Sequence, residues 1–241
     1  MARIRKLSIV VPVFNEEKTI RDILKQLSEL ALPDNIPFEI IVVNDGSTDR
    51  TADLLSTQAK NKRITVLHHE RNRGKGAAVR TGIHKARGDY IIIQDADLEY
   101  DPKYISTLIA ELKKNSVYVV YGTRLHRLPH IHKEESRVRF LIHYFGNRFL
   151  SLITSIFYGQ WITDMETCYK LFPRSAVADI QLESKGFEFE PEITAKLMKA
   201  GYRIHEVPIT TVPRGYEEGK KLDTVKDGIR ALTALIKYRF V

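Results

Sequence analysis

The chain has 241 residues, of which 43% are hydrophobic, and it contains 13 glycines and 9 prolines. This composition excludes a collagen-like or low-complexity protein, and a folded chain of this length buries roughly 70% of the surface that its unfolded form exposes. The formal net charge of +8 favours anionic partners such as phosphorylated molecules, nucleic acid or an acidic membrane surface. The single cysteine, Cys168, excludes an internal disulfide and a zinc cluster built from cysteines, and it favours a reducing compartment such as the cytoplasm.

Short apolar runs alternate with amphipathic segments through the first half of the chain. The apolar runs predict buried strands at 7–11, 38–43, 64–67, 90–93 and 117–121. Apolar residues at helical spacing predict helices at about 20–31, 49–59, 77–86 and 102–112. We expect Asn15 to cap the first of these helices. Four strand-to-helix alternations indicate an α/β fold with a mostly parallel sheet and right-handed crossovers.

The pattern changes after Gly122, where residues 124–137 are basic and rich in histidine and predict a mobile loop. One apolar stripe then predicts a long helix over 138–158; it consists of Val138, Leu141, Ile142, Phe145, Phe149, Leu152, Ile153 and Ile156. The remaining predicted elements are a strand at 169–172, a helix at 192–200, a strand at 204–207, a basic loop at 213–222 and a helix at 224–238. Because no linker rich in glycine or serine interrupts the chain, we expect a single domain, 1–241, with halves 1–123 and 124–241.

Polar clusters follow the predicted strands at the points where the strands end. They are Pro12–Glu16 after the first strand, Asn44–Asp49 after the second and Asp95–Asp97 after the fourth. Gly74-Lys75-Gly76 precedes a helix, whose first N–H groups can attract an anion together with the lysine. In parallel α/β sheets, ligands bind at the carboxyl ends of the strands, so these clusters are the first candidates for a site.

Asp95 and Asp97 form an acidic pair one residue apart. Residues i and i+2 lie on the same face of an extended strand, so both carboxylates can converge on one ion at the strand end. Their hard oxygen ligands suit Mg²⁺ or Mn²⁺, with substrate phosphates and water completing the coordination, and Glu99 is a candidate further ligand. The alternative is a cluster of turn and capping residues without a metal.

In combination and order, these motifs resemble the family 2 glycosyltransferases of the GT-A fold, in particular the polyprenyl-phosphate (dolichyl-phosphate) mannose and glucose synthases. The matching segments are 11–16, 44–49, 74–76, 95–99, 163–172, and Arg214 with 219–222. The resemblance covers nearly the whole chain. It implies a GT-A fold in which 1–123 binds a nucleotide sugar and 124–241 forms an acceptor-side half.

The resemblance also implies an activity and a set of site residues. The activity is metal-dependent, inverting transfer of a hexose from a GDP-mannose or UDP-glucose type of donor to a polyprenyl or dolichyl phosphate. The implied nucleotide-binding residues are Pro12, Phe14, Glu16, Asp45, Lys75, Asp95 and Ala96. The implied metal ligands are Asp95, Asp97 and Glu99, and the implied catalytic residues are Asp97, Arg124, Arg214 and Lys220, with Lys221 as an alternative to Lys220.

The acceptor decides which further groups the chemistry needs. A polyprenyl phosphate is already anionic and needs cations rather than a general base, whereas a sugar hydroxyl acceptor needs a base, for which Asp164 is the candidate. A nucleotidyltransferase is a further alternative, although it usually has a glycine-rich loop where Pro12–Glu16 stands. A non-catalytic nucleotide-binding protein is another. We expect no nucleic-acid partner, because the predicted strands are apolar rather than interleaved with basic and aromatic residues.

A lipid acceptor would require contact with a membrane. We expect no signal peptide, because the apolar run after the basic N-terminus soon reaches Pro12, and no transmembrane helix, because no 18 apolar residues stand together. The stripe over 138–156, with Arg137, Arg139 and Arg148 beside it, predicts peripheral association with an anionic cytoplasmic membrane face. The alternative is that the stripe packs on the sheet.

Overall fold

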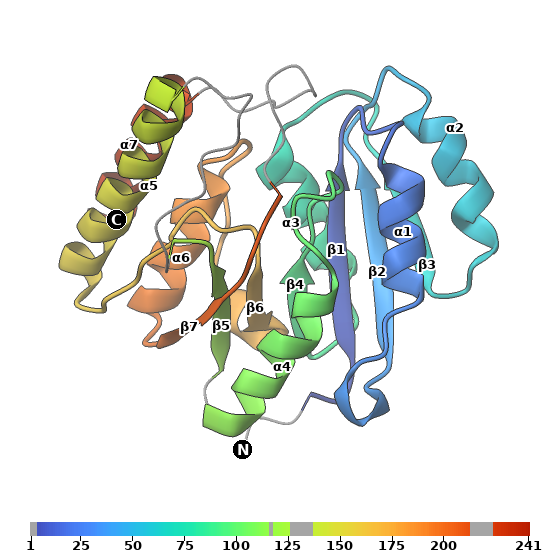
Figure 1. The fold of residues 1–241 in the computed structure, drawn as a ribbon, viewed down its shortest axis with the longest axis horizontal. Helices are drawn as coiled ribbons and strands as arrows, with labels where there is room; N and C mark the ends of the chain where they lie inside the picture. The colour runs from blue at the N-terminus through green and yellow to red at the C-terminus, as the bar shows by residue number, and fades with distance from the viewer. Residues whose placement is uncertain (1–3, 116–117, 126–136, 213–223) are drawn as a thin grey trace.

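The structure is a computed structural model that describes residues 4–115, 118–125, 137–212 and 224–241. Within these residues the chain forms a seven-stranded sheet in the order β3-β2-β1-β4-β6-β5-β7, with helices on both sides of it (Figure 1). The fold class predicted from the sequence, a mostly parallel α/β sheet flanked by helices, is therefore confirmed.

One half of the sheet is wholly parallel. It consists of β1 (Leu7–Val13), β2 (Phe38–Asn44), β3 (Ile64–His68) and β4 (Tyr90–Ile93). All seven residues of β1 are buried, which is why its sequence is a nearly continuous apolar run. Parallel pairing places the carboxyl ends of these strands at one edge of the sheet, so the polar clusters that follow them lie at the same edge.

The other half of the sheet contains a strand of opposite direction. β6 (Lys170–Pro173) runs antiparallel between β4 and β5 (Val119–Thr123), and β7 (Ile204–Pro208) pairs parallel with β5. The sequence predicted these three strands but not their pairing. The inserted β6 connects the second half of the chain, residues 124–241, directly to the central strand β4.

The helices follow the predicted order. α1 (Ile20–Ser28) and α4 (Lys103–Asn115) lie in front of the sheet in Figure 1, and α3 (Lys75–Lys85) lies behind it. α2 (Thr51–Ser56) is shorter than predicted because a 3₁₀ turn continues it over Thr57–Lys60. α6 (Phe189–Lys199) packs between α3 and the pair α5 (Arg137–Tyr158) and α7 (Thr224–Phe240). It begins three residues before the predicted start, with Pro191 in its first turn, where proline costs no hydrogen bond.

Asn15 does not cap α1, so that prediction was wrong. The helix begins at Ile20, after a turn, and Asn15 instead takes a left-handed backbone conformation with φ of 50°. Its Oδ1 accepts a hydrogen bond from the backbone N–H of Thr48 at 2.8 Å, and its own N–H donates to Ser47 Oγ at 3.0 Å. Asn15 therefore joins the loops that follow β1 and β2.

Four residues of the apolar stripe of α5 face solvent, whereas Ile153 packs against the core. The stripe's described members with large exposed fractions are Phe145 (61%), Phe149 (53%), Leu152 (43%) and Ile156 (67%). The opposite side of α5 is buried and, apart from Leu150, mostly polar. Ser151 and Ser155 accept hydrogen bonds there from the backbone N–H groups of Met165 and Ile162 at 2.9 and 3.0 Å. Since the inner face is committed to these hydrogen bonds, the expectation that the stripe packs on the sheet does not hold for these residues.

Candidate active site

The loops after β1, β2 and β4 meet at the carboxyl edge of the sheet, which is the upper edge in Figure 1. The N–H of Asp45 donates to the carbonyl oxygen of Val13 at 2.8 Å, and the N–H of Gln94 donates to that of Val10 at 2.9 Å. The polar clusters predicted from the sequence are thus brought together by the parallel register. Side chains from this edge form the candidate site.

Asp45 organises the loop that leads into α3. Its buried carboxylate accepts hydrogen bonds from the backbone N–H groups of Arg73 and Gly74, at 3.0 and 2.7 Å, and its Oδ1 lies 2.6 Å from Nδ1 of His69. The other ring nitrogen of His69 lies 2.9 Å from Oγ1 of Thr81. His69 was not singled out from the sequence, because its partner lies 24 residues away. Contact between Asp45 and a nucleotide base stays a prediction.

Close packing explains the glycines on either side of Lys75, Gly74 and Gly76. Gly74 has a φ of 95°, and a β-carbon there would lie 2.3 Å from the carbonyl oxygen of Lys185. A β-carbon on Gly76 would lie 2.6 Å from the carbonyl oxygen of Ser184. Both positions therefore require glycine, and their close approach brings the start of α3 against the loop before α6.

Lys75 joins the acidic pair to α6 through that approach. Its Nζ lies 2.8 Å from Oδ1 and 3.0 Å from Oδ2 of Asp95, and 3.3 Å from Oε1 of Glu190. Oε2 of Glu190 lies 2.6 Å from Nζ of Lys170, a fully buried lysine that also donates to the carbonyl oxygens of Met165 and Thr167. We call Asp95, Lys75, Glu190 and Lys170 the charge chain, because their charges alternate from the acidic pair into the core.

The charges of the first two members stabilise each other. Burial lowers the pKa of Lys75, but Asp95, Cys168 and Glu190 together outweigh burial and place that pKa well above its ordinary value. Burial raises the pKa of Asp95, but Lys75, Cys168 and Arg124 together outweigh burial, and the net pKa lies below the ordinary value. Both groups are therefore charged at neutral pH.

The chain bends directly after the acidic pair, at Leu98. Leu98 has a left-handed φ of 64°, and the N–H of Glu99 donates to Oδ1 of Asp97 at 3.0 Å. In the described part of the chain, no three His, Cys, Asp or Glu side chains gather closely enough to hold a metal ion by themselves. The donor set still fits Mg²⁺ or Mn²⁺, because such ions are commonly bound through one or two carboxylates plus substrate phosphates. The metal-ligand roles of Asp95, Asp97 and Glu99 stay predictions.

Arg124 and Asp164 form a second ion pair at this edge. Nε and Nη2 of Arg124 lie 2.7 and 2.8 Å from the two oxygens of Asp164, whose carboxylate also accepts from the N–H of Arg124 and from Nδ2 of Asn147. Burial raises the pKa of Asp164, but Arg124 outweighs burial and the pKa lies below its ordinary value. A carboxylate in such a bidentate pair is a poor proton acceptor, which contradicts the role of general base predicted for Asp164.

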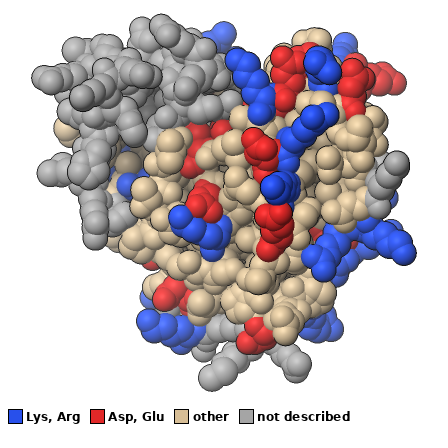
Figure 2. All heavy atoms as spheres, turned by 45° about the vertical axis from the view of Figure 1, so that its right-hand side comes forward, with Lys and Arg blue, Asp and Glu red and all other residues tan. Residues whose placement is uncertain are grey.

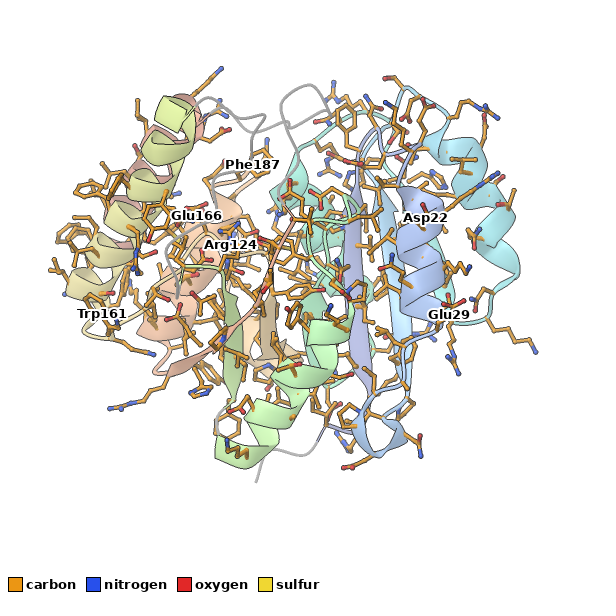
Figure 3. All side chains as sticks on the ribbon, in the orientation of Figure 1. Asp22, Glu29, Arg124, Trp161, Glu166 and Phe187 are labelled. Atoms are coloured by element: carbon orange, nitrogen blue, oxygen red, sulfur yellow. The ribbon has the colours of Figure 1, made fainter. Side chains whose placement is uncertain are left out.

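Glu166, like Glu190, is an acidic residue that the sequence did not single out. Figure 3 shows it beside Arg124, between α5 and the sheet, and its Oε1 is buried without a hydrogen-bond partner among the described residues. Burial raises the pKa of Glu166 to about 7; Glu190 and Asp164 add to this effect, while Lys170 and Arg124 oppose it. Glu166 lies in a segment that matched the family motif, but nothing in its spacing indicated burial.

The remaining predicted residues occupy the rim or fall outside the described residues. Pro12 and Ala96 are buried, Phe14 is half-buried, and the buried Glu16 accepts a hydrogen bond from Oγ1 of Thr19 at 2.9 Å. Arg214, Lys220 and Lys221 lie outside the described residues. On the face drawn in Figure 2, lysine and arginine are interspersed with aspartate and glutamate. The absence of a nucleic-acid partner stays a prediction.

The fold defines the class of protein: this is the architecture of GT-A glycosyltransferases. Glucosyl-3-phosphoglycerate synthase of Mycobacterium tuberculosis superposes with a TM-score of 0.72 over 98% of this chain and 81% of that enzyme, at 19% sequence identity. The chain belongs to the glycosyl transferase family 2, whose sequence profile matches residues 8–181, and it is a glycosyltransferase. The resemblance predicted from the motifs is therefore confirmed at the level of the family.

Three relatives show how far the likeness extends. An uncharacterized protein of Methanocaldococcus jannaschii, MJ1222, is 30% identical over 96% of this chain and 91% of its own length. A dolichyl-phosphate beta-glucosyltransferase of Dictyostelium discoideum is 29% identical over 97% of this chain and 74% of its own. The low-salt glycan biosynthesis hexosyltransferase Agl6 of Haloferax volcanii is 30% identical over 93% of this chain. The match covers about half (51%) of the length of Agl6.

Proposed function

We propose that this protein transfers a hexose from a nucleotide sugar to a polyprenyl or dolichyl phosphate, with Mg²⁺ or Mn²⁺. The observation that carries the proposal is the position of two cationic groups at one sheet edge. Lys75 is paired with Asp95 of the acidic pair. Arg124, which is oriented by Asp164, is near enough for its charge to lower the pKa of Asp95. Fixed cations on both sides of one point suit a reaction that brings two anionic substrates together.

The side chains suggest how the reaction is assisted. The divalent cation would be held by Asp95 and Asp97, and when bound it stabilises the negative charge that develops on the leaving diphosphate. Lys75 and the first N–H groups of α3 add positive charge at the donor end. The guanidinium of Arg124 would hold the acceptor phosphate, and a single displacement would invert the anomeric centre.

The donor is proposed to be UDP-glucose rather than GDP-mannose. A relative named as a dolichyl-phosphate beta-glucosyltransferase supports glucose, and the similar M. tuberculosis enzyme has been crystallised with Mn²⁺, UDP and phosphoglyceric acid. A direct test supplies UDP-glucose or GDP-mannose with Mn²⁺ and either polyprenyl phosphate in vesicles or 3-phosphoglycerate. We expect transfer from UDP-glucose to the polyprenyl phosphate. Transfer to 3-phosphoglycerate with none to the lipid would reject the proposed acceptor.

Arg124 allows the acceptor role to be separated from donor binding. In Arg124→Lys the positive charge remains beside Asp164, but the bidentate geometry is lost. We expect turnover with polyprenyl phosphate to fall about tenfold or more while UDP affinity changes less than twofold. Arg174→Lys is the matched control, because this exposed arginine donates to the carbonyl oxygen of Gly88 away from the carboxyl edge. Loss of UDP affinity that accounts for the whole loss of turnover would contradict the acceptor role.

One observation favours a second candidate function, transfer to a sugar hydroxyl. Glu166 has a buried, unpartnered oxygen and a pKa raised to about 7 by burial, which are properties of a general base at neutral pH. A hydroxyl acceptor would need such a base and an ionised phosphate would not. Glu166→Gln should therefore abolish transfer to a hydroxyl acceptor, whereas transfer to polyprenyl phosphate should survive it.

We also propose that α5 places the protein on the cytoplasmic face of an anionic membrane. Among the described residues, no helix is long and apolar enough to cross a bilayer, so such contact would be peripheral. The exposed face of Phe145, Phe149, Leu152 and Ile156 carries the partly buried Arg148 beside it, and Trp161, 70% exposed, follows the end of the helix (Figure 3). Apolar area flanked by basic groups is the pattern of an interfacial helix.

Liposome binding tests this surface. We expect binding to anionic vesicles that weakens as salt rises, and Phe149→Glu should reduce it without unfolding the protein because the side chain is exposed. Tyr118→Glu is the control, since Tyr118 is 56% exposed but precedes β5 at the opposite end of the strands. Equal binding of both variants, or no binding at low salt, would remove the membrane from the proposal.

A further inference from the structure

The charge chain contains a conflict that the proposed reaction does not by itself explain. Both oxygens of Asp95 are within 3.0 Å of the Lys75 ammonium, so the carboxylate that is predicted to hold a divalent cation is already neutralised. A divalent cation and an ammonium that share one carboxylate repel each other. Since Lys75 contacts both oxygens of Asp95, binding of the cation favours movement of Lys75 away from Asp95.

Glu190 provides a second place for the ammonium. Its Oε1 lies only 3.3 Å from Nζ of Lys75, and this oxygen has no hydrogen-bond partner among the described residues. A small movement of Nζ away from Asp95 and toward Glu190 would convert this long ion pair into a short one. The lysine can thus exchange carboxylates without entering solvent.

Glu190 is fixed in place by its contact with Lys170. Its other oxygen lies 2.6 Å from the fully buried Lys170, which is itself fixed by the carbonyl oxygens of Met165 and Thr167. The side chain of Glu190 is 3% exposed, compared with 15% for Lys75 and 20% for Asp95. Asp95 and Lys75 are thus the more accessible members of the charge chain, whereas Glu190 and Lys170 are buried.

We propose that Lys75 is a built-in competitor for the divalent cation at Asp95, and that Glu190 is the positioning residue that receives the Lys75 ammonium when the cation binds. The proposal rests on the proposed function only in taking Asp95 as a cation ligand. Its consequence is coupling between ligands: without nucleotide, the lysine opposes the cation. With the donor bound, the diphosphate supplies negative charge for both, so cation and nucleotide bind together.

Binding of Mn²⁺, followed by electron paramagnetic resonance with and without UDP, tests this exchange in the absence of any acceptor. Lys75→Met should bind Mn²⁺ alone about tenfold more tightly than the wild type, because the competing charge is gone. The same variant should lose most of the increase in Mn²⁺ affinity that UDP produces in the wild type. A lysine that only binds diphosphate would leave the affinity for Mn²⁺ alone unchanged.

A substitution at Glu190 should change the affinity for Mn²⁺ in the opposite direction to Lys75→Met. In Glu190→Asp the carboxylate keeps its charge for Lys170 but is withdrawn from Lys75, so the ammonium is held by Asp95 alone. Mn²⁺ alone should then bind severalfold more weakly than to the wild type, and Lys75→Met in the same chain should cancel that loss. Glu190→Gln should also weaken the binding of Mn²⁺ alone. A thermal melt checks that this variant is folded.

Lys6→Met is the matched control, because Lys6 forms an ion pair of 2.7 Å with Glu39 at the other end of the strands. Its Mn²⁺ affinity should equal that of the wild type. The proposal is overturned if Lys75→Met binds Mn²⁺ alone no more tightly than Lys6→Met. Failure of the polyprenyl-phosphate acceptor would leave these measurements unaffected, so the two proposals fail separately.

Discussion

α1 and α5 show the same kind of apolar spacing and put it to opposite uses. α1 buries its apolar face, including Ile23 and Leu27, against the sheet. α5 buries a mostly polar face, and the apolar side chains of Phe145, Phe149, Leu152 and Ile156 are turned toward solvent. The comparison teaches that periodicity determines the helix, whereas the hydrogen-bonding needs of the neighbouring segment decide which face is buried.

Truncation of a leucine in each helix should give the largest contrast. Leu27→Ala in α1 is expected to lower the free energy of unfolding by about 3 kcal/mol, because it leaves a cavity at a fully buried position. Leu152→Ala in α5 is expected to change it by less than about 0.5 kcal/mol, because Leu152 is 43% exposed. Urea unfolding of both variants measures the contrast. Similar losses would show that α5 packs its stripe after all.

Glu166, which α5 helps to enclose, should make stability depend on pH. Its folded pKa of about 7 lies above the ordinary 4.5, so the folded protein keeps a proton that the unfolded chain releases. Stability is unaffected below pH 4.5, falls as pH rises toward 7, and remains lower above it. Glu166→Gln, which is neutral throughout, should therefore gain up to roughly 3 kcal/mol at pH 8 and nothing in acid. An equal gain at all pH values would refute the shifted pKa.

A matched carboxylate serves as the control for that experiment. Glu183 is exposed and forms a surface ion pair with Lys237 at 2.8 Å. Glu183→Gln should show no gain above pH 7, because surface pairs contribute little. A gain like that of Glu166→Gln would mean that the loss of any negative charge stabilises this basic protein.

The polar face of α5 should contribute more to stability than its apolar face. Ser151→Ala removes the acceptor of the Met165 N–H and leaves a buried donor unpaired, at a cost of about 1–2 kcal/mol. Thr233→Ala in α7 removes only a local hydrogen bond at an exposed position and should cost much less. Equal losses in urea unfolding would show that the buried polar seam has no special role.

Asp97 should have the smallest effect on stability and a large one on activity. Asp97→Asn keeps an Oδ1 that can accept the 3.0 Å hydrogen bond from Glu99, so unfolding should change by less than about 0.5 kcal/mol. Transfer that depends on Mn²⁺ should nevertheless fall about a hundredfold, because a ligand charge is lost. Parent activity with unchanged dependence on Mn²⁺ would reject Asp97 as a metal ligand.

The sequence by itself determined the elements, their order and the family. Buried parallel strands need continuous apolar runs and helices need a repeating stripe, so β1 to β4 and α1 to α4 could be located from side-chain hydrophobicity. The motifs at the strand ends lie together because parallel register brings those ends to one edge. Each of these inferences depends on residues close to one another in the chain.

Only the tertiary structure decided which distant residues are partners. Lys170 lies in a predicted strand, and its buried charge is compensated by Glu190, 20 residues away on α6, and by the carbonyl oxygens of Met165 and Thr167. Asp164 was the candidate base for a hydroxyl acceptor, and it is paired with Arg124, 40 residues away. The charge state of a buried group is set by the groups that the fold places around it. Hydrophobic periodicity, which reports only local burial, therefore carries no record of those partners.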